Sequence, residues 1–87
     1  MIQLLDFNAE WCGPCRVMKP VFEELAKTYA GKVEFKSIDV DVDGASAEKY
    51  GVMSIPTFVI VKDGKEMSRK IGAMPKDMLK MWIDTNL

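Results

Sequence analysis

Two cysteines separated by a Gly-Pro dipeptide have the most evident chemistry in this sequence. Cys12 and Cys15 are the only cysteines among its 87 residues. Residues three apart on a helix have Cβ atoms about 5–6 Å apart, which is close to the separation that a disulfide requires. The spacing therefore predicts a pair of thiols that forms and breaks a disulfide with little movement of the backbone.

The position of the pair at the start of an expected helix predicts different roles for the two thiols. Cys12 should lie at the helix N-terminus, where unpaired N–H groups and the helix dipole stabilise a thiolate. Cys15 should lie one turn further on, more buried and less acidic. Cys12 would then attack a disulfide of another protein, and Cys15 would resolve the mixed disulfide.

The spacing alone also allows two other uses of the pair. A structural disulfide across so short a loop would remove little chain entropy and add little stability. A zinc site needs four ligands, but the chain offers two thiolates and no histidine, so a second copy would have to complete it. The absence of histidine also excludes Ser-His and Cys-His catalysis. We expect no bound cofactor or metal beyond a redox-active disulfide.

Charge and hydropathy exclude several classes of partner. The 12 basic and 13 acidic residues leave a net charge of −1, which argues against binding to nucleic acid or to a membrane surface. No apolar run approaches the roughly 20 residues that span a bilayer. The first residues lack the features of a signal peptide, although a mature chain would look the same.

Hydrophobic periodicity and turn signals predict the elements that position the cysteines. We expect strands at 1–8, 33–40, 57–61 and 66–71, and helices at 13–30, at 45–50 and from Pro75 onward. The order β-α-β-α-β-β-α predicts an α/β fold with a four-stranded mixed sheet and flanking helices. Residues 1–87 should form one domain.

The first and last helices each have an apolar face that should pack on this sheet. These faces comprise Val17, Met18, Val21, Phe22, Leu25, Ala26 and Tyr29 in the first helix, and Met78, Leu79, Trp82 and Ile83 in the last.

Three segments together resemble the thioredoxin family. Residues 6–15, Asp-Phe-Asn-Ala-Glu-Trp-Cys-Gly-Pro-Cys, are similar to its active-site segment. Residues 50–58, Tyr-Gly-Val-Met-Ser-Ile-Pro-Thr-Phe, resemble its cis-proline loop, and residues 71–73, Ile-Gly-Ala, its glycine segment near the site. The resemblance covers essentially the whole chain. It implies a thioredoxin-like fold and the reduction of disulfides in protein substrates.

The resemblance also implies roles for the residues that carry the chemistry. Cys12 matches the nucleophile and Cys15 the resolving thiol, while Asp6 matches a buried carboxylate that exchanges protons with Cys15. The residues themselves agree, because a carboxylate in an apolar strand is desolvated and its pKa rises. Such a group is a suitable base near neutral pH.

Substrate binding is implied by a second group of matched residues. Pro56 resembles the cis-proline that faces the disulfide, and the backbone of Ile55 would pair with an extended substrate segment. The apolar docking patch would comprise Trp11, Gly13, Pro14, Ile55, Pro56, Gly72, Ala73 and Met74.

The partners that the resemblance implies are disulfide-containing proteins and a thioredoxin reductase, NADPH- or ferredoxin-linked, as electron donor. The resemblance further implies a cytoplasmic protein that takes part in electron transport and cell redox homeostasis. Two alternatives remain: a disulfide isomerase, and a partner-binding module that does not use its thiols. We expect a monomer, with a dimer through an edge strand as the other option.

The sequence departs from the family pattern in three places. It begins at the strand that leads into the active site, as a shortened form lacking the usual first strand and helix would. The strand at 33–40 should then be an open edge, protected by Glu34 and Lys36. Asn8 stands where the family usually has a tryptophan, and Ser37 where it has a lysine partner for the buried aspartate. Asp6 should therefore keep a raised pKa.

Overall fold

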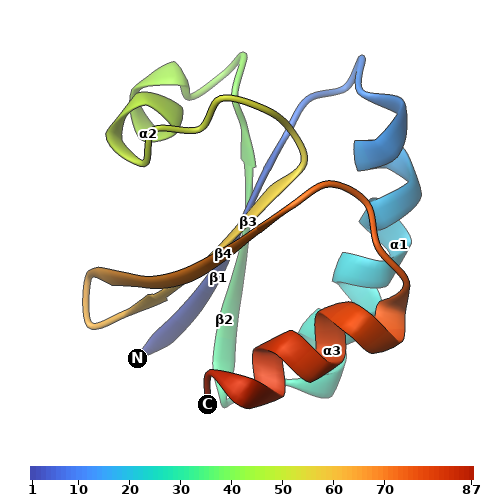
Figure 1. Cartoon of the computed structure of the whole chain (residues 1–87), viewed down its shortest axis with the longest axis vertical. Helices are drawn as coiled ribbons and strands as arrows, with labels where there is room; N and C mark the ends of the chain where they lie inside the picture. Colours follow the sequence, from blue (N-terminus) through green and yellow to red (C-terminus); the bar gives the residue numbers. More distant parts are fainter.

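The computed structural model describes residues 1–87 and contains four strands and three helices (Figure 1). In chain order they are β1 (Ile2–Asn8), α1 (Gly13–Thr28), β2 (Val33–Asp39), α2 (Gly44–Lys49), β3 (Thr57–Lys62), β4 (Lys65–Ile71) and α3 (Lys76–Thr85). The predicted order β-α-β-α-β-β-α is confirmed. No helix is long and apolar enough to cross a membrane.

The strands form one mixed sheet in the order β2-β1-β3-β4. β1 is parallel to β2, because α1 returns the chain to the start of the sheet, and it is antiparallel to β3. β3 and β4 form a hairpin. Its turn places Asp63 at φ 51° and Gly64 at φ 83°, the left-handed pair that a two-residue hairpin favours. β2 forms one edge of the sheet, as predicted.

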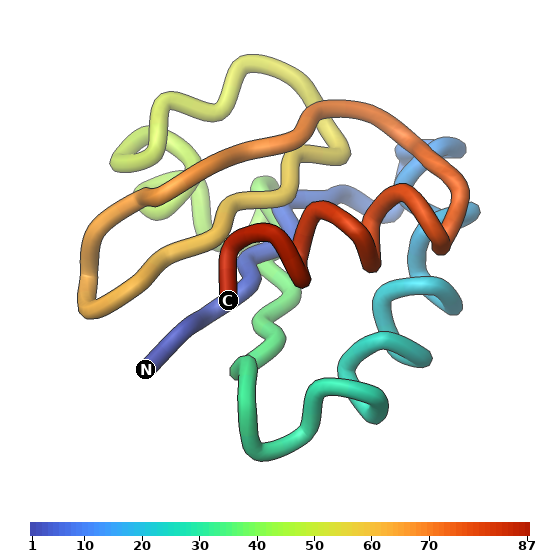
Figure 2. Tube along the Cα trace, turned by 60° about the horizontal axis from the view of Figure 1, so that its bottom comes forward, coloured from blue at the N-terminus to red at the C-terminus, as the bar shows by residue number.

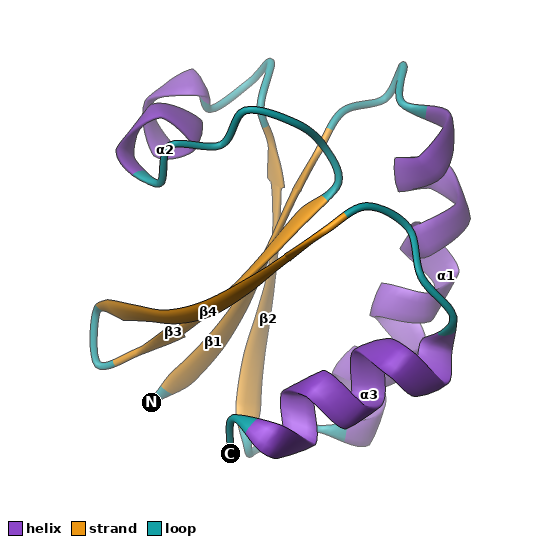
Figure 3. Cartoon of the chain, in the orientation of Figure 1, coloured by secondary structure: helices purple, strands orange, loops and turns teal.

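The helices cover both faces of the sheet. Figure 3 shows α1 and α3 on one side and α2 on the other. Because successive side chains of a strand point to opposite faces, β1 contributes residues to the apolar clusters on both faces of the sheet. Leu4 belongs to the cluster under α1 and α3, whereas Leu5 and Phe7 belong to the cluster under α2. Asp6 shares the α1 face with Leu4.

Two residues of the predicted helical faces are not in the core. Val17 on α1 is 65% exposed and Met78 on α3 is 51% exposed. Each precedes a fully buried residue, Met18 or Leu79, and one residue along a helix is a rotation of about 100°. The contact between helix and sheet is narrower than the apolar face suggested by the sequence.

Three loops gather at one end of the sheet. Figures 1 and 2 show the loop after β1, the loop before β3 and the loop after β4 close to one another there. The amide N–H of Gly72 donates to the carbonyl of Pro56 at 2.8 Å, which ties two of these loops together. The Cys12–Cys15 pair lies at the same end, where the loop after β1 enters α1.

Candidate active site

The two cysteines are joined as a disulfide at the N-terminus of α1. Their Cα atoms are 5.2 Å apart. Cys12 is the N-cap residue, with an extended backbone, and Pro14 lies in the first turn, where the missing N–H of proline costs no helical hydrogen bond. Both cysteines are therefore held at the start of the helix, Cys12 as its cap and Cys15 in its first turn.

The helix end treats the two sulfur atoms differently. The backbone N–H of Cys15 donates to Sγ of Cys12 at 3.2 Å, and no acidic side chain lies in the first turn. A negative charge on Cys12 is thus favoured by this donor and by the helix dipole. The expected difference in burial was wrong: Cys12 is 5% and Cys15 6% exposed, because Cys12 packs with Ala9 and Ile55.

Asp6 on β1 is a buried carboxylate, only 4% exposed. Burial raises its pKa from the ordinary value of 3.8 to about 7, and the Asn8 amide opposes that rise. Its Oδ1 atom has no hydrogen-bond partner. The expected rise in the pKa of Asp6 agrees with this burial.

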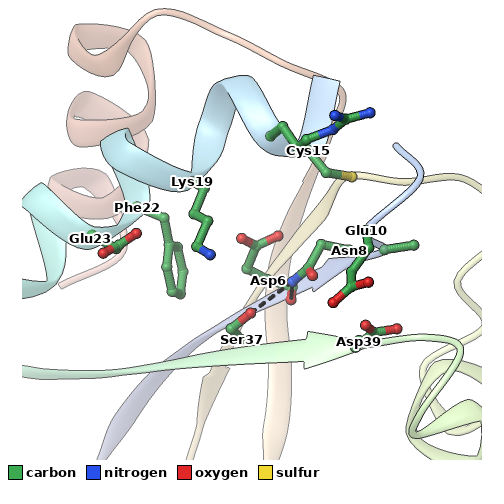
Figure 4. Close-up of a pocket in the computed structure, with 11 residues that line it drawn as sticks. Asp6, Asn8, Glu10, Cys15, Lys19, Phe22, Glu23, Ser37 and Asp39 are labelled. Atoms are coloured by element: carbon green, nitrogen blue, oxygen red, sulfur yellow. Dashed lines mark hydrogen bonds between the residues drawn. The ribbon is translucent and has the colours of Figure 1, made fainter. Parts of the chain in front are cut away.

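Asp6 and Cys15 line the same cavity, which we call the rear pocket (Figure 4). Its volume is about 570 Å³. It lies between α1, the end of β1 and β2. It is lined by Asp6, Asn8, Ala9, Glu10, Cys15, Arg16, Lys19, Phe22, Glu23, Ser37 and Asp39.

The two side chains that depart from the family pattern meet in the rear pocket. The Nδ2 group of Asn8 donates to Oγ of Ser37 at 2.8 Å and to the backbone carbonyl of Asp6 at 2.8 Å. Both are small and uncharged, so they leave open space beside the carboxylate. Sequence reasoning identified each departure separately but missed the pocket that they share.

We use the name front face for five residues near the disulfide on three loops: Trp11, Ile55, Pro56, Gly72 and Ala73. Trp11 and Ala73 are exposed and Ile55 and Gly72 are half-buried, whereas the Pro56 side chain is buried. The Ile55–Pro56 peptide bond is cis, as the resemblance implies. The carbonyl oxygen of Ile55 lies 4.0 Å from Sγ of Cys12. Trp11 is 67% exposed, so it is not a core residue.

The front face borders a second hollow of about 430 Å³. It is lined by Trp11, Val40, Ala47, Val52, Met53, Ser54 and Ile55. The indole Nε1 of Trp11 donates to Oδ2 of Asp41 at 2.8 Å, which fixes the ring at its rim. Sequence reasoning missed Asp41, because 30 residues separate it from Trp11 and no local pattern connects the two.

The remaining members of the predicted docking patch differ in their surroundings. Gly13, Pro14 and Ala73 are exposed near the disulfide. Met74 instead packs against the core under α1 and α3, and its N–H donates to Sδ of Met18 at 3.4 Å. Met74 therefore contributes more to attaching the last loop than to an open docking surface.

Comparison with known proteins decides the family. The thioredoxin family model matches residues 1–85. Thioredoxins of Staphylococcus aureus strains Mu50, MW2 and N315 are each 46% identical over 86 residues, which cover 99% of this chain and 83% of each relative. The chain belongs to the thioredoxin family. It is a thiol-disulfide oxidoreductase that reduces disulfides in protein substrates through the Cys12–Cys15 couple.

Membership of the thioredoxin family also accounts for the architecture around this couple. The four-stranded mixed sheet and its three helices form a thioredoxin-like fold. The sheet brings the loops that carry Cys12, Pro56 and Gly72 to one end, and it places Asp6 under the first helix.

Proposed function

We propose that Cys12 is the attacking thiolate, that Cys15 is the resolving thiol and that Asp6 is the base for Cys15. The observation that carries this proposal is the position of the buried Asp6 carboxylate, which has a pKa of about 7 and lines the same pocket as Cys15. A group with that pKa can accept a proton from a thiol and return it to water near neutral pH.

The reaction then proceeds in two exchanges. The Cys12 thiolate attacks one sulfur of the substrate disulfide, forming a mixed disulfide and releasing the other substrate sulfur as a thiolate. Cys15 transfers its proton to Asp6 and attacks Sγ of Cys12. The mixed disulfide breaks, the Cys12–Cys15 disulfide forms, and the substrate leaves with both sulfurs reduced.

Substrate docking is assigned to the front face. The exposed Trp11 ring and the backbone around Ile55 and Pro56 offer an extended peptide an apolar surface and main-chain hydrogen-bonding groups. Gly72 and Ala73 have no large side chains that would obstruct a docked peptide. Gly13 and Pro14 border the disulfide. Recognition mainly through the backbone suits an enzyme that acts on many sequences.

The wider setting follows from the same proposal. After each turnover the Cys12–Cys15 disulfide must be reduced again by an electron donor, for which we propose a thioredoxin reductase. We also propose that the protein works in a reducing compartment such as the cytoplasm. We propose that residues 1–87 act as one domain, as a monomer and without a bound cofactor. Electron transport to protein disulfides and redox homeostasis would be the cellular role.

Trapping of the intermediate tests the two cysteine roles. Cys15→Ser should accumulate a mixed disulfide with insulin, whereas Cys12→Ser should accumulate none, as measured by mass spectrometry after thiol blocking. A stable adduct through Cys15 in Cys12→Ser would reverse the assignment.

A redox titration of the wild-type chain against dithiothreitol tests the reductase direction. A reduction potential at or below the cytosolic glutathione poise, roughly −220 to −320 mV depending on the method, is expected. A potential well above that range would favour the isomerase alternative.

A further inference from the structure

The rear pocket contains a cation whose role is not explained by the docking or exchange steps. Lys19 lies on α1, one turn after Cys15, and lines the pocket together with Asp6. Figure 4 shows the Lys19 side chain extending from α1 into the pocket, on the side where Asp6 lies. Lys19 belongs to none of the five ion pairs of the structure, so its charge is not held elsewhere.

A nearby positive charge would stabilise the ionised form of Asp6. Its Oδ1 atom is buried without a hydrogen-bond partner, and an ionised carboxylate in that position is costly unless an opposite charge lies nearby. Ser37 faces Asp6 from β2 but supplies only a hydroxyl, which is already bonded to Asn8. The neighbouring Lys36 pairs across from Leu5 on the other face, 3.9 Å from Glu34.

Most of the other charged groups around Asp6 do not stabilise its ionised form. Glu10 after β1, Glu23 on α1 and Asp39 on β2 are acidic, and each disfavours a further negative charge. Arg16 on α1 is the second cation of the pocket. On the sheet side, Asp6 is paired with the apolar Phe58, and Lys70 of β4 lies beyond it.

We propose that Lys19 is a positioning residue that keeps Asp6 ionised until Cys15 transfers its proton, and that the rear pocket is the route by which this proton reaches water. This inference rests on the proposed role of Asp6. The Cys15 thiol gives its proton to the Asp6 carboxylate and becomes the attacking thiolate. The Asp6 carboxylic acid then loses the proton to water in the pocket.

A carboxylate titration of the full chain tests the inference directly. The variants are Lys19→Met, the conservative Lys19→Arg, and the matched control Lys27→Met, which removes the same charge from an exposed position in the last turn of the same helix. The Asp6 carboxyl carbon is followed by NMR in the oxidised protein labelled with ¹³C-aspartate. The titration midpoint of Asp6 should rise by about 0.5–1 pH unit in Lys19→Met and stay at the wild-type value in the other two variants.

An Asp6 midpoint that moves equally in Lys19→Met and Lys27→Met would overturn the inference, since the effect would then be one of net charge. An Asp6 midpoint unchanged in Lys19→Met would overturn it as well. The proposed role of Asp6 is tested separately by the rate at which the mixed disulfide resolves in Asp6→Asn. If that rate is normal while the Lys19→Met midpoint shifts, the base assignment fails and the effect of Lys19 on Asp6 stands.

Discussion

The two sides of the Cys12–Cys15 disulfide are built in opposite ways. The front face is formed by loop backbone around Ile55, Pro56 and Gly72, with one exposed aromatic ring, Trp11. The rear pocket is formed by side chains of regular elements, with a buried carboxylate and several charges around it. If the proposed roles hold, docking depends on the backbone geometry of loops, whereas proton transfer depends on individual side chains.

The two single-residue departures from the family pattern fall on one side of this comparison. Asn8 and Ser37 both lie in the rear pocket, and neither belongs to the front face. Under the proposed roles, Asn8 and Ser37 change the surroundings of Asp6 without changing the residues assigned to substrate docking. The front face should therefore govern which disulfides are reached, and the rear pocket should govern how the reaction depends on pH.

The largest effect is expected from Asp6→Asn, which removes the base of the rear pocket. Resolution of the mixed disulfide near pH 8 should slow by about 100-fold, measured by stopped-flow with a protein substrate. Formation of the mixed disulfide by Cys12 should be nearly unchanged. Equal slowing of both steps would contradict the separation of the two sides.

Asp6 should also make stability depend on pH. Its folded-state pKa of about 7 exceeds the ordinary value of 3.8, so the folded state holds the proton more tightly. Stability should therefore fall as the pH rises from about 4 to 7 and level off above that. At pH 8, Asp6→Asn should raise the free energy of unfolding by about 2–4 kcal/mol, as urea denaturation at pH 4, 6 and 8 would show. The prediction would be contradicted if the gain in stability of Asp6→Asn over wild type were no larger at pH 8 than at pH 4.

Trp11→Ala should weaken the front face and leave the rear pocket intact. We expect kcat/KM for a protein disulfide to fall by about tenfold, the size expected for an exposed aromatic anchor. Reaction with a small aromatic disulfide should stay close to wild type, because it needs no docking surface. Met81→Ala is the matched control: Met81 is 69% exposed against 67% for Trp11 but lies on α3, away from the disulfide.

A lysine introduced on β2, across the rear pocket from Lys19, should restore the effect of Lys19 on the pKa of Asp6. Ser37 pairs with Asp6 across β1 and β2, so Ser37→Lys places a cation on the same face of the sheet. In the double variant with Lys19→Met, the Asp6 pKa should be about 1 unit lower than in Lys19→Met alone, measured by the same carboxyl titration. An Asp6 pKa as high as in the single variant would show that position on α1, rather than charge, is what matters.

The smallest effect is expected at Gly72, in the backbone of the front face. Its φ of 95° is a conformation that side chains rarely adopt, although a Cβ there would meet no atom within 4 Å. Gly72→Ala should cost about 1 kcal/mol of stability, measured by thermal unfolding. Gly44→Ala is the matched control, because Gly44 has an equally open environment and lies in α2 without a left-handed backbone; it should cost nothing.

Much of this site could be predicted from the sequence because its strongest signals are local. The Cys12–Cys15 spacing, the Gly-Pro between them and the apolar strand ahead all lie within a short segment, and short-range geometry governs disulfide formation. The Asp63-Gly64 turn and the order of elements are equally local. The burial of Asp6 followed from the apolar strand around it.

Other features depended on which segments the sheet brings together. The bond from Trp11 to Asp41, the packing of Met74 on the core, and the exposure of Val17 and Met78 all arise from long-range packing. The equal burial of Cys12 and Cys15 is also tertiary, since Ile55 covers Cys12 from a loop far along the chain. No periodic pattern carries such information, because each contact joins residues from different elements.

The sequence by itself determined the redox pair, the order of the elements and the thioredoxin family, because all three are expressed in residue types at fixed short spacings. Only the tertiary structure decided that Asn8 and Ser37 open one pocket, that this pocket reaches both Asp6 and Cys15, and that Lys19 points into it. The physical reason is that a buried charge interacts through space: its energy depends on which groups surround it in the fold, whatever their distance along the chain.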